Sequence, residues 1–238
     1  MTISTLLWAR LDNQDVWIIL FGSFSFGLLG LIDDYIKVVK QSYRGLSGRL
    51  RLIVGFLIAF VAVYFIQAQH LDDLNKSLAL PIFKDHLVFM GAFFFPFAML
   101  VVVGSANAVN LTDGLDGLAI MPVIIAGASL GIIAYIVGRA DYSSYLDVHY
   151  IRGGGEILIF SAALIGSGLG FLWYNAPPAA VFMGDTGSLS LGSALGCIAV
   201  SIKHELVLFI VGGLFAVSYT HLRAHETPEH LVCRLLLE

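Results

Sequence analysis

The sequence carries few charged residues and few cysteines. Asp, Glu, Lys and Arg make up 13% of its 238 residues, about half of the roughly 25% that is usual in soluble domains. The two cysteines, Cys197 and Cys233, provide neither a zinc-ligand pattern nor a disulfide framework. No Walker A loop is present, which excludes an ATP-driven pump of the P-loop kind. The composition therefore excludes a secreted disulfide scaffold, a disordered chain and a soluble dinucleotide-binding domain.

Apolar residues make up 58% of the chain, and they come in long blocks. The mean hydropathy is +0.87, and one soluble core of this size could not bury so much apolar surface. Runs of about 17 or more such residues are typical of membrane-spanning helices. The runs cover 16–32, 52–69, 87–109, 118–138, 156–173 and 189–202, with a shorter one at 206–217. The sequence predicts an all-α, polytopic transmembrane helix bundle of about eight helical elements.

We expect residues 1–217 to form one transmembrane domain that continues beyond both ends of the chain. Residues 1–8 resemble the second half of a helix, and the apolar pattern breaks between Val217 and Ser218. We expect residues 218–238 to be foreign to the domain, because they interrupt a run too short to cross a bilayer. Two alternatives for this tail are a metal or nucleotide loop with His221 and His225, four residues apart, and a solvated amphipathic end.

The positions of Lys and Arg predict the orientation. The connection after the first long run holds five of them, more than any other connection: Lys37, Lys40, Arg44, Arg49 and Arg51. The positive-inside rule places this connection in the cytoplasm. Counting spans from there brings three polar segments, 33–37, 110–117 and 182–188, to the same membrane face. We therefore expect a multi-pass protein whose polar site faces the cytoplasm.

Five aspartates belong to these three segments: Asp33, Asp34, Asp113, Asp116 and Asp185. Ionisable groups at helix ends in a polytopic protein are candidates for function. Carboxylates that converge repel one another unless a cation neutralises them, and Mg²⁺ accepts one or two carboxylates together with phosphate oxygens. Lys37, Lys40 and Arg44 could hold further phosphate charge. The pattern predicts a Mg²⁺-dependent phosphate site at the membrane surface, and phosphoryl transfer to a lipid is the simplest chemistry there.

Each acidic segment also has a purely structural interpretation. Asp33 and Lys37 are spaced as an i,i+4 ion pair on a helix that continues past the membrane. Asp113 or Asp116 could cap the next span at its N-terminus, and Asp185 could cap the helix that it precedes. Phe182 could simply be an aromatic residue at the membrane interface.

The polar segments together resemble the phospho-N-acetylmuramoyl-pentapeptide transferase family. The resemblance lies in Asp-Asp-Tyr at 33–35 with Lys37, in the motif from Asn107 to Leu118, and in Phe-Leu-Trp-Tyr-Asn at 171–175 followed by Phe-Met-Gly-Asp-Thr-Gly-Ser at 182–188. It implies a ten-helix fold that transfers phospho-N-acetylmuramoyl-pentapeptide from its UDP carrier to undecaprenyl phosphate. The products would be lipid I and UMP, with Mg²⁺ as cofactor.

The resemblance also implies roles for individual residues. Asp33 and Asp34 match the catalytic aspartate pair, one of which acts as a base or as a nucleophile, and Asp185 matches the catalytic, Mg²⁺-binding aspartate. Substrate-binding positions are matched by Lys37 on the phosphate side, by Phe182 near uracil, and by four polar residues: Asn110, Asp113, Asp116 and Asn175. A second lysine of the family is replaced by Gln41.

The implied setting is peptidoglycan synthesis, and with it cell shape and division, in the bacterial inner membrane. The partners would be the UDP-linked substrate, undecaprenyl phosphate and membrane lipid, with no nucleic acid, while a homodimer stays open. Family members carry further helices on both sides of the matched region, so we expect this chain to be a partial and poorly active version. Two other functions stay open: transfer of a related N-acetylhexosamine phosphate to a polyprenyl phosphate, and ion-coupled transport through carboxylates at mid-membrane.

Overall fold

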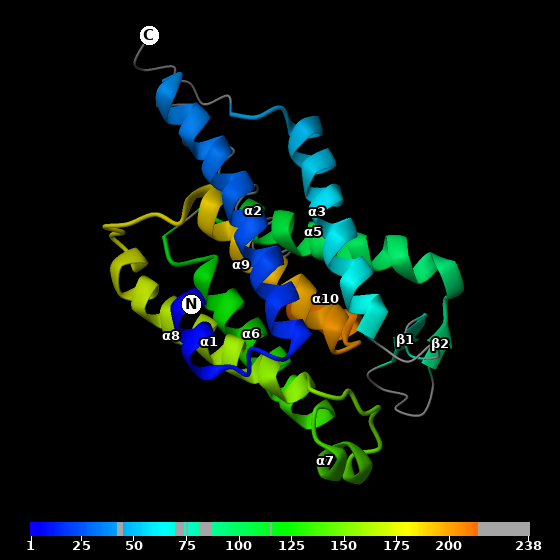
Figure 1. Ribbon diagram of the computed structural model, residues 1–238. Coiled ribbons are helices and arrows are strands. Elements are labelled where there is room, and N and C mark those ends of the chain that lie inside the picture. The colour runs from blue at the N-terminus through cyan, green and yellow to red at the C-terminus, as the bar shows by residue number, and fades with distance from the viewer. Residues whose placement is uncertain (42–44, 70–73, 75, 81–86, 115, 214–238) are drawn as a thin grey trace.

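A computed structural model describes residues 1–41, 45–69, 74, 76–80, 87–114 and 116–213. The described part is a bundle of α-helices with one short hairpin (Figure 1). Its α-helices are α1 (Thr2–Trp8), α2 (Gln14–Val39), α3 (Gly48–Gln69), α5 (Phe94–Thr112), α6 (Ile120–Val137), α7 (Ala140–Tyr145), α8 (Ile157–Asn175), α9 (Gly184–Ser201) and α10 (Glu205–Val211). Two 3₁₀ turns, η1 (Gly91–Phe93) and η2 (Gly154–Glu156), lead into α5 and α8.

Helix α9 lies at the centre of the bundle, between α2 and α5 (Figure 1). Its sequence is rich in Gly, Ser and Ala, and all of residues 192–201 are buried. The helices approach closely where glycine leaves room: a Cβ on Gly30 would collide with the backbone of Asp185, and one on Gly192 with the backbone of Ser105. The hydroxyls of Ser23 and Ser190 add a 2.8 Å hydrogen bond between α2 and α9.

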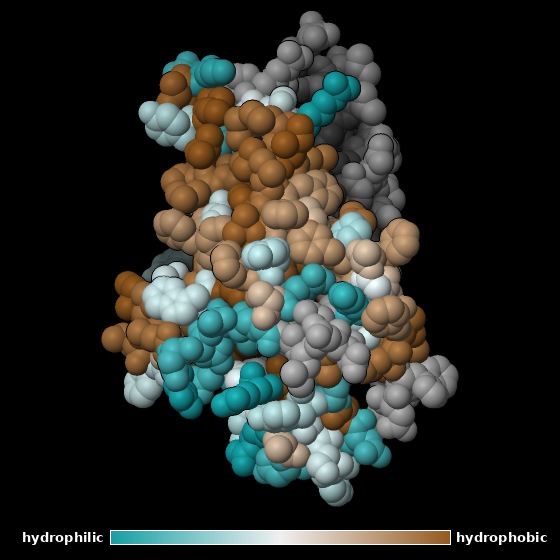
Figure 2. Space-filling view, turned by 45° about the vertical axis from the view of Figure 1, so that its right-hand side comes forward, coloured by the Kyte–Doolittle hydropathy of each residue, from teal (hydrophilic) through white to brown (hydrophobic). Residues whose placement is uncertain are grey.

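Five helical segments of the described residues are long and apolar enough to cross a membrane. They are Gln14–Val39, Gly48–Gln69, Gly91–Thr112, Ile120–Val137 and Gly154–Asn175. Their outward faces expose large apolar side chains, and Figure 2 shows a broad hydrophobic area with most hydrophilic residues below it and a few above it. The prediction of an all-α, multi-pass membrane bundle is confirmed. The run at 189–202 forms part of α9, the inner helix, which is not among the five segments.

The structure corrects the prediction at the start of the run 87–109. Residues 87–89 are not helical but form strand β2 (Leu87–Phe89), which pairs antiparallel with β1 (Ser77–Ala79) and places Leu78 opposite Val88. Valine and phenylalanine fit a strand as well as they fit an apolar helix, so hydropathy alone did not separate the two. Helix α7 was not predicted either. The break at 217–218 and the whole tail lie outside the described residues.

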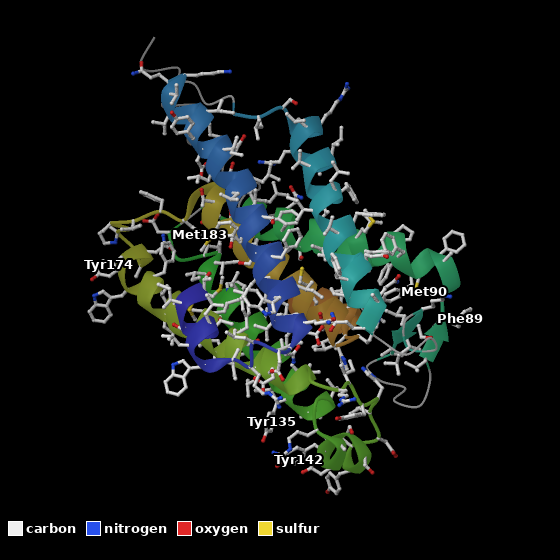
Figure 3. The ribbon with its side chains drawn as sticks, in the orientation of Figure 1. Phe89, Met90, Tyr135, Tyr142, Tyr174 and Met183 are labelled. Atoms are coloured by element: carbon white, nitrogen blue, oxygen red, sulfur yellow. The ribbon has the colours of Figure 1, made fainter. Side chains whose placement is uncertain are left out.

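The two ends of the bundle differ in character. The hairpin and α7 lie at one end (Figure 1), where Tyr135 and Tyr142 flank Arg139, whose guanidinium is 5.5 and 5.2 Å from their ring centres (Figure 3). At the opposite end α2 and α5 finish, α3 begins, and the connection from α8 enters α9. The chain therefore brings the three predicted polar segments, and the start of α3, to one end of the molecule.

Candidate active site

The side chain of Lys37 stands among three carboxylates from two helices. Its Nζ lies 2.7 Å from Asp33 Oδ2 and 3.6 Å from Asp34 Oδ1, all within α2, and 2.5 Å from Asp185 Oδ2 of α9. The predicted i,i+4 pair of Asp33 and Lys37 exists, but it is one part of a larger cluster. One oxygen from each of these three aspartates lies within 4.8 Å of the others.

Asp185 belongs to the first turn of α9 but does not cap it. The N-cap residue is Met183, and no side chain makes a capping hydrogen bond there. Asp185 Oδ1 instead accepts a 2.5 Å hydrogen bond from Asn110 Nδ2 of α5, which also reaches Ser188 Oγ at 2.9 Å. Asn110 therefore fixes the carboxylate of Asp185 on the side away from Lys37. The capping interpretation of Asp185 is wrong.

Each aspartate of the pair is held by a different segment. Asp33 is buried, and its Oδ1 accepts a 2.5 Å hydrogen bond from the backbone N–H of Leu46, ahead of α3. Gly45 permits this approach, because a Cβ there would collide with the Asp33 carboxylate. Asp34 Oδ2 accepts hydrogen bonds from the backbone N–H and the hydroxyl of Thr186, at 3.0 and 2.9 Å.

Asn175 and Asp116 tie loops together beside this cluster. Asn175 is buried, accepts from the Gly117 N–H at 2.9 Å and donates to the Val181 carbonyl at 2.9 Å. Asp116 Oδ2 accepts from the Ala179 N–H at 2.9 Å. Together the two side chains join residues 116–117 to residues 175–181. The structure thus gives them a supporting position, and Asp116 is not a helix cap because Ala119 is the N-cap of α6.

Asp113 ends α5 as its C-cap residue, not as a cap of the next span. Burial, together with the charges of Asp185 and Asp34, raises the pKa of Asp113 to about 6. The Asp113 carboxyl group therefore interacts electrostatically with this cluster and is a fourth acidic group beside it. Phe182 is 72% exposed at the surface, and Met183 next to it lies beside the start of α9 (Figure 3).

The cluster includes groups that the sequence analysis did not place in the site. Arg51, counted only for membrane orientation, puts Nη1 3.6 Å from Asp185 Oδ2. Its Nε is buried with no hydrogen-bond partner in the described part of the chain. Thr186 and Ser188 belong to the motif at 182–188 that carries the family resemblance, but no role was predicted for either. No periodicity signals these contacts, because they join helices far apart in sequence. Lys40 is exposed at the end of α2, and Arg44 lies outside the described residues.

The donor set fits a hard divalent cation. Mg²⁺ takes one or two carboxylates together with phosphate oxygens and water, and the three carboxylates lie close enough for two of them to share one ion. Lys37, which was expected to hold phosphate charge, and Arg51, which was not, supply positive charge beside these carboxylates. The arrangement can therefore bind anionic phosphate oxygens through its two cations and a divalent cation through its carboxylates.

The fold and this site define a multi-pass membrane protein with an acidic, lysine-centred site at one end of its helices. The model of glycosyl transferase family 4 matches residues 16–203, and the chain belongs to this family.

The chain is similar to proteins named phospho-N-acetylmuramoyl-pentapeptide-transferase. It is 64% identical over 217 residues to one from Ruegeria sp. (strain TM1040), with 91% of this chain and 60% of the relative covered. It is 64% identical over 214 residues to one from Ruegeria pomeroyi, with 90% and 59% covered. A third, from Maricaulis maris, is 59% identical over 220 residues, with 90% and 59% covered. The chain spans about 60% of the length of these relatives.

Proposed function

We propose that this chain carries the active site of a phospho-N-acetylmuramoyl-pentapeptide transferase, which forms lipid I and UMP from the UDP-linked substrate and undecaprenyl phosphate. The observation that carries the proposal is the meeting of Asp33, Asp34 and Asp185 around Lys37. The names of the relatives favour this substrate over other N-acetylhexosamine phosphates. Carboxylates gathered at one end of the helices favour a transferase over a transporter with carboxylates at mid-membrane.

In the proposed reaction an oxygen of the lipid phosphate attacks the phosphorus that bears the sugar. A new P–O bond forms, the P–O bond to the uridine phosphate breaks, and UMP leaves with that electron pair. One aspartate of the pair, Asp33 or Asp34, accepts the proton of the lipid phosphate. In the alternative course that aspartate is itself the nucleophile: its carboxylate attacks the sugar-bearing phosphorus and releases UMP, and the lipid phosphate then displaces the carboxylate from that phosphorus. Lys37 and Arg51 hold phosphate oxygens in position, which is the larger part of catalysis in phosphoryl transfer.

We propose Mg²⁺ as the cofactor, held by Asp185 together with an aspartate of the pair. The support is the chemistry of the donor set, three oxygen ligands on rigid helices. An ion held there would supply positive charge against the diphosphate oxygens and the leaving group. Asn110 keeps Asp185 oriented toward that position. The site would face the cytoplasm from the bacterial inner membrane, as the Lys and Arg of residues 37–51 suggest.

The test uses this chain and a full-length chimera in which residues 16–203 replace the matching segment of the Ruegeria sp. relative. Each is purified and supplied with UDP-linked substrate, undecaprenyl phosphate and Mg²⁺. We expect the chimera to form lipid I and UMP in equal amounts, and to lose both with Asp185→Asn. A chimera that is folded and makes neither product would contradict the proposal. So would product formation that survives Asp185→Asn undiminished.

A further inference from the structure

The carboxylate of Asp34 has one oxygen sequestered and one directed into the site. Its Oδ2 accepts both hydrogen bonds from Thr186, at 3.0 Å from the backbone N–H and 2.9 Å from the hydroxyl. The same oxygen lies against Gly184, where an added Cβ would stand 3.0 Å from it. Its Oδ1 lies 3.6 Å from Lys37 Nζ, on the side of the other carboxylates. The two oxygens are therefore not equivalent.

The attachment joins two helices. Asp34 belongs to the last part of α2, and Thr186 to the first turn of α9, beside Asp185. The two helices touch here, because a Cβ on Gly30, one turn before Asp34, would collide with Asp185 and Thr186. The hydrogen bond from the Thr186 hydroxyl therefore ties the Asp34 side chain of α2 to the first turn of α9. A free aspartate side chain at a helix end would sample several rotamers, and two hydrogen bonds to one oxygen select one of them.

We propose that Thr186 is a positioning residue for the transfer reaction: its hydroxyl holds Asp34 so that Oδ1, and not Oδ2, faces Lys37 and the bound phosphate. This inference rests on the proposed function. Thr186 itself does not contact the reacting atoms. Its effect should fall on the rate of the bound complex and not on the affinity for the nucleotide substrate.

The variants are Thr186→Val, which removes the hydroxyl at constant shape, and Thr186→Ser, which keeps it. Since the backbone hydrogen bond remains in Thr186→Val, we expect a partial loss of kcat, about tenfold, with KM for the UDP-linked substrate within about twofold of the parent chimera. Thr186→Ser should restore kcat to within about threefold of the parent value. Ser190→Ala is the matched control, because it removes the hydroxyl one turn further along α9, which bonds Ser23 and no carboxylate. It should leave kcat unchanged.

Variants that also carry Asp34→Asn test whether the Thr186 hydroxyl acts through the Asp34 carboxylate or has only a structural role. If the hydroxyl acts through the Asp34 carboxylate, Thr186→Val should change the residual rate there by less than about twofold. A tenfold loss in both backgrounds would overturn the inference, and so would a normal kcat in Thr186→Val or a failure of Thr186→Ser to restore it.

A readout without activity separates this inference from the proposed function. The infrared band of the Asp34 carboxylate is isolated as the difference between the chimera and its Asp34→Asn variant. Thr186→Val should shift that band and Thr186→Ser should not, because a lost hydrogen bond changes the carboxylate stretch. If the parent chimera forms no lipid product, the proposed function fails, and the band still decides whether the Thr186 hydroxyl holds Asp34: a shift supports that contact, and an unmoved band overturns the inference.

Discussion

The aspartates around Lys37 share one cation and differ in everything else that holds them. Asp33 is buried against the Leu46 N–H, Asp34 is bonded by Thr186, and Asp185 is bonded by Asn110. Each of the three carboxylates is therefore positioned by a different hydrogen-bond donor. Such an arrangement suits a site in which the aspartates do different tasks within one reaction.

Replacing these aspartates one at a time tests whether they act as a unit. Asp33→Asn, Asp34→Asn and Asp185→Asn should each lower kcat of the chimera by about 10²-fold or more, since each removes charge at the reacting centre. Double variants should lose little beyond the worse single variant. Turnover and circular dichroism measured together separate chemistry from folding. Losses that simply multiply would show that the three residues act independently.

Asp113 carries a prediction about stability. Because its pKa is raised to about 6 in the folded chain, the folded state binds its proton more tightly than the unfolded state does. Ionising it therefore costs stability, and this cost grows as the pH rises from about 4 to about 6 and stays constant above. Asp113→Asn should stabilise the chain by about 1 kcal/mol at pH 7.5, allowing for partial exposure.

The measurement for Asp113→Asn is thermal unfolding in detergent without divalent cations. The gain in melting temperature should shrink steadily as the pH falls. It should vanish near pH 4, where Asp113 of the folded chain is protonated and as neutral as the amide that replaces it. A gain that is independent of pH would show that burial and charge at Asp113 are not its source.

At the residue scale, the sequence predicted which residues gather but not how each is used. Asp33, Asp34, Lys37, Asn110 and Asp185 meet as expected, since each lies in the part of its helix that is at one end of the bundle. Asn175 and Asp116 were expected at the substrate, and the structure engages both in hydrogen bonds to loop backbone. Such contacts depend on loop conformation, which spacing along the chain does not determine.

Among the elements, α9 organises the site because it contacts the three helices that supply partners for Asp185, which are α2, α3 and α5. It approaches α2 closely at Gly30, where an added Cβ would collide with the backbone of Asp185 and Thr186. That contact sets the distance between the aspartate pair and the third carboxylate. The geometry of the site is therefore a consequence of small residues in two helices.

Gly30→Ala should push α2 and α9 apart. We expect a loss of stability of about 1–3 kcal/mol and a large loss of kcat, because overpacking moves the helix backbones. Gly166→Ala in α8 is the control, since nothing lies within 4 Å of the Cβ that it adds. Thermal unfolding and turnover are compared for both variants. Equal changes in melting temperature and in turnover for the two variants would contradict a tight contact between α2 and α9.

The elements also show where hydropathy stops being informative. Runs of apolar residues predicted α3, α6 and α8 to within about four residues, whereas the run at 16–32 stops seven residues before the end of α2 and the run at 87–109 starts seven residues before α5. They misassigned residues 87–89, since a short apolar stretch has the same composition in a strand and in a helix. Helix α7, Ala140–Tyr145, has mixed polarity and no apolar face, and it gave no such signal.

For the whole molecule, the account requires one membrane face to hold the ends of α2, α5 and α8. Cysteines at Gln41 and Ala180 should react with a membrane-impermeant reagent from one side, and a cysteine at Tyr145 from the other. These positions are exposed, whereas Thr112 and Ser143 on the same two faces are buried and would react poorly. The native cysteines are replaced by alanine first. Labelling of Gln41 and Tyr145 from the same side would contradict the predicted topology.

The most direct test of the central claim combines topology with chemistry. The chimera is sealed into vesicles that contain undecaprenyl phosphate, and the orientation of each preparation is determined by labelling at Gln41. UDP-linked substrate is then added outside, and UMP release is measured. We expect release only when the face with Gln41 and Ala180 is outside, and none with Asp185→Asn. Release from vesicles of the opposite orientation, or release that survives Asp185→Asn, would contradict the account.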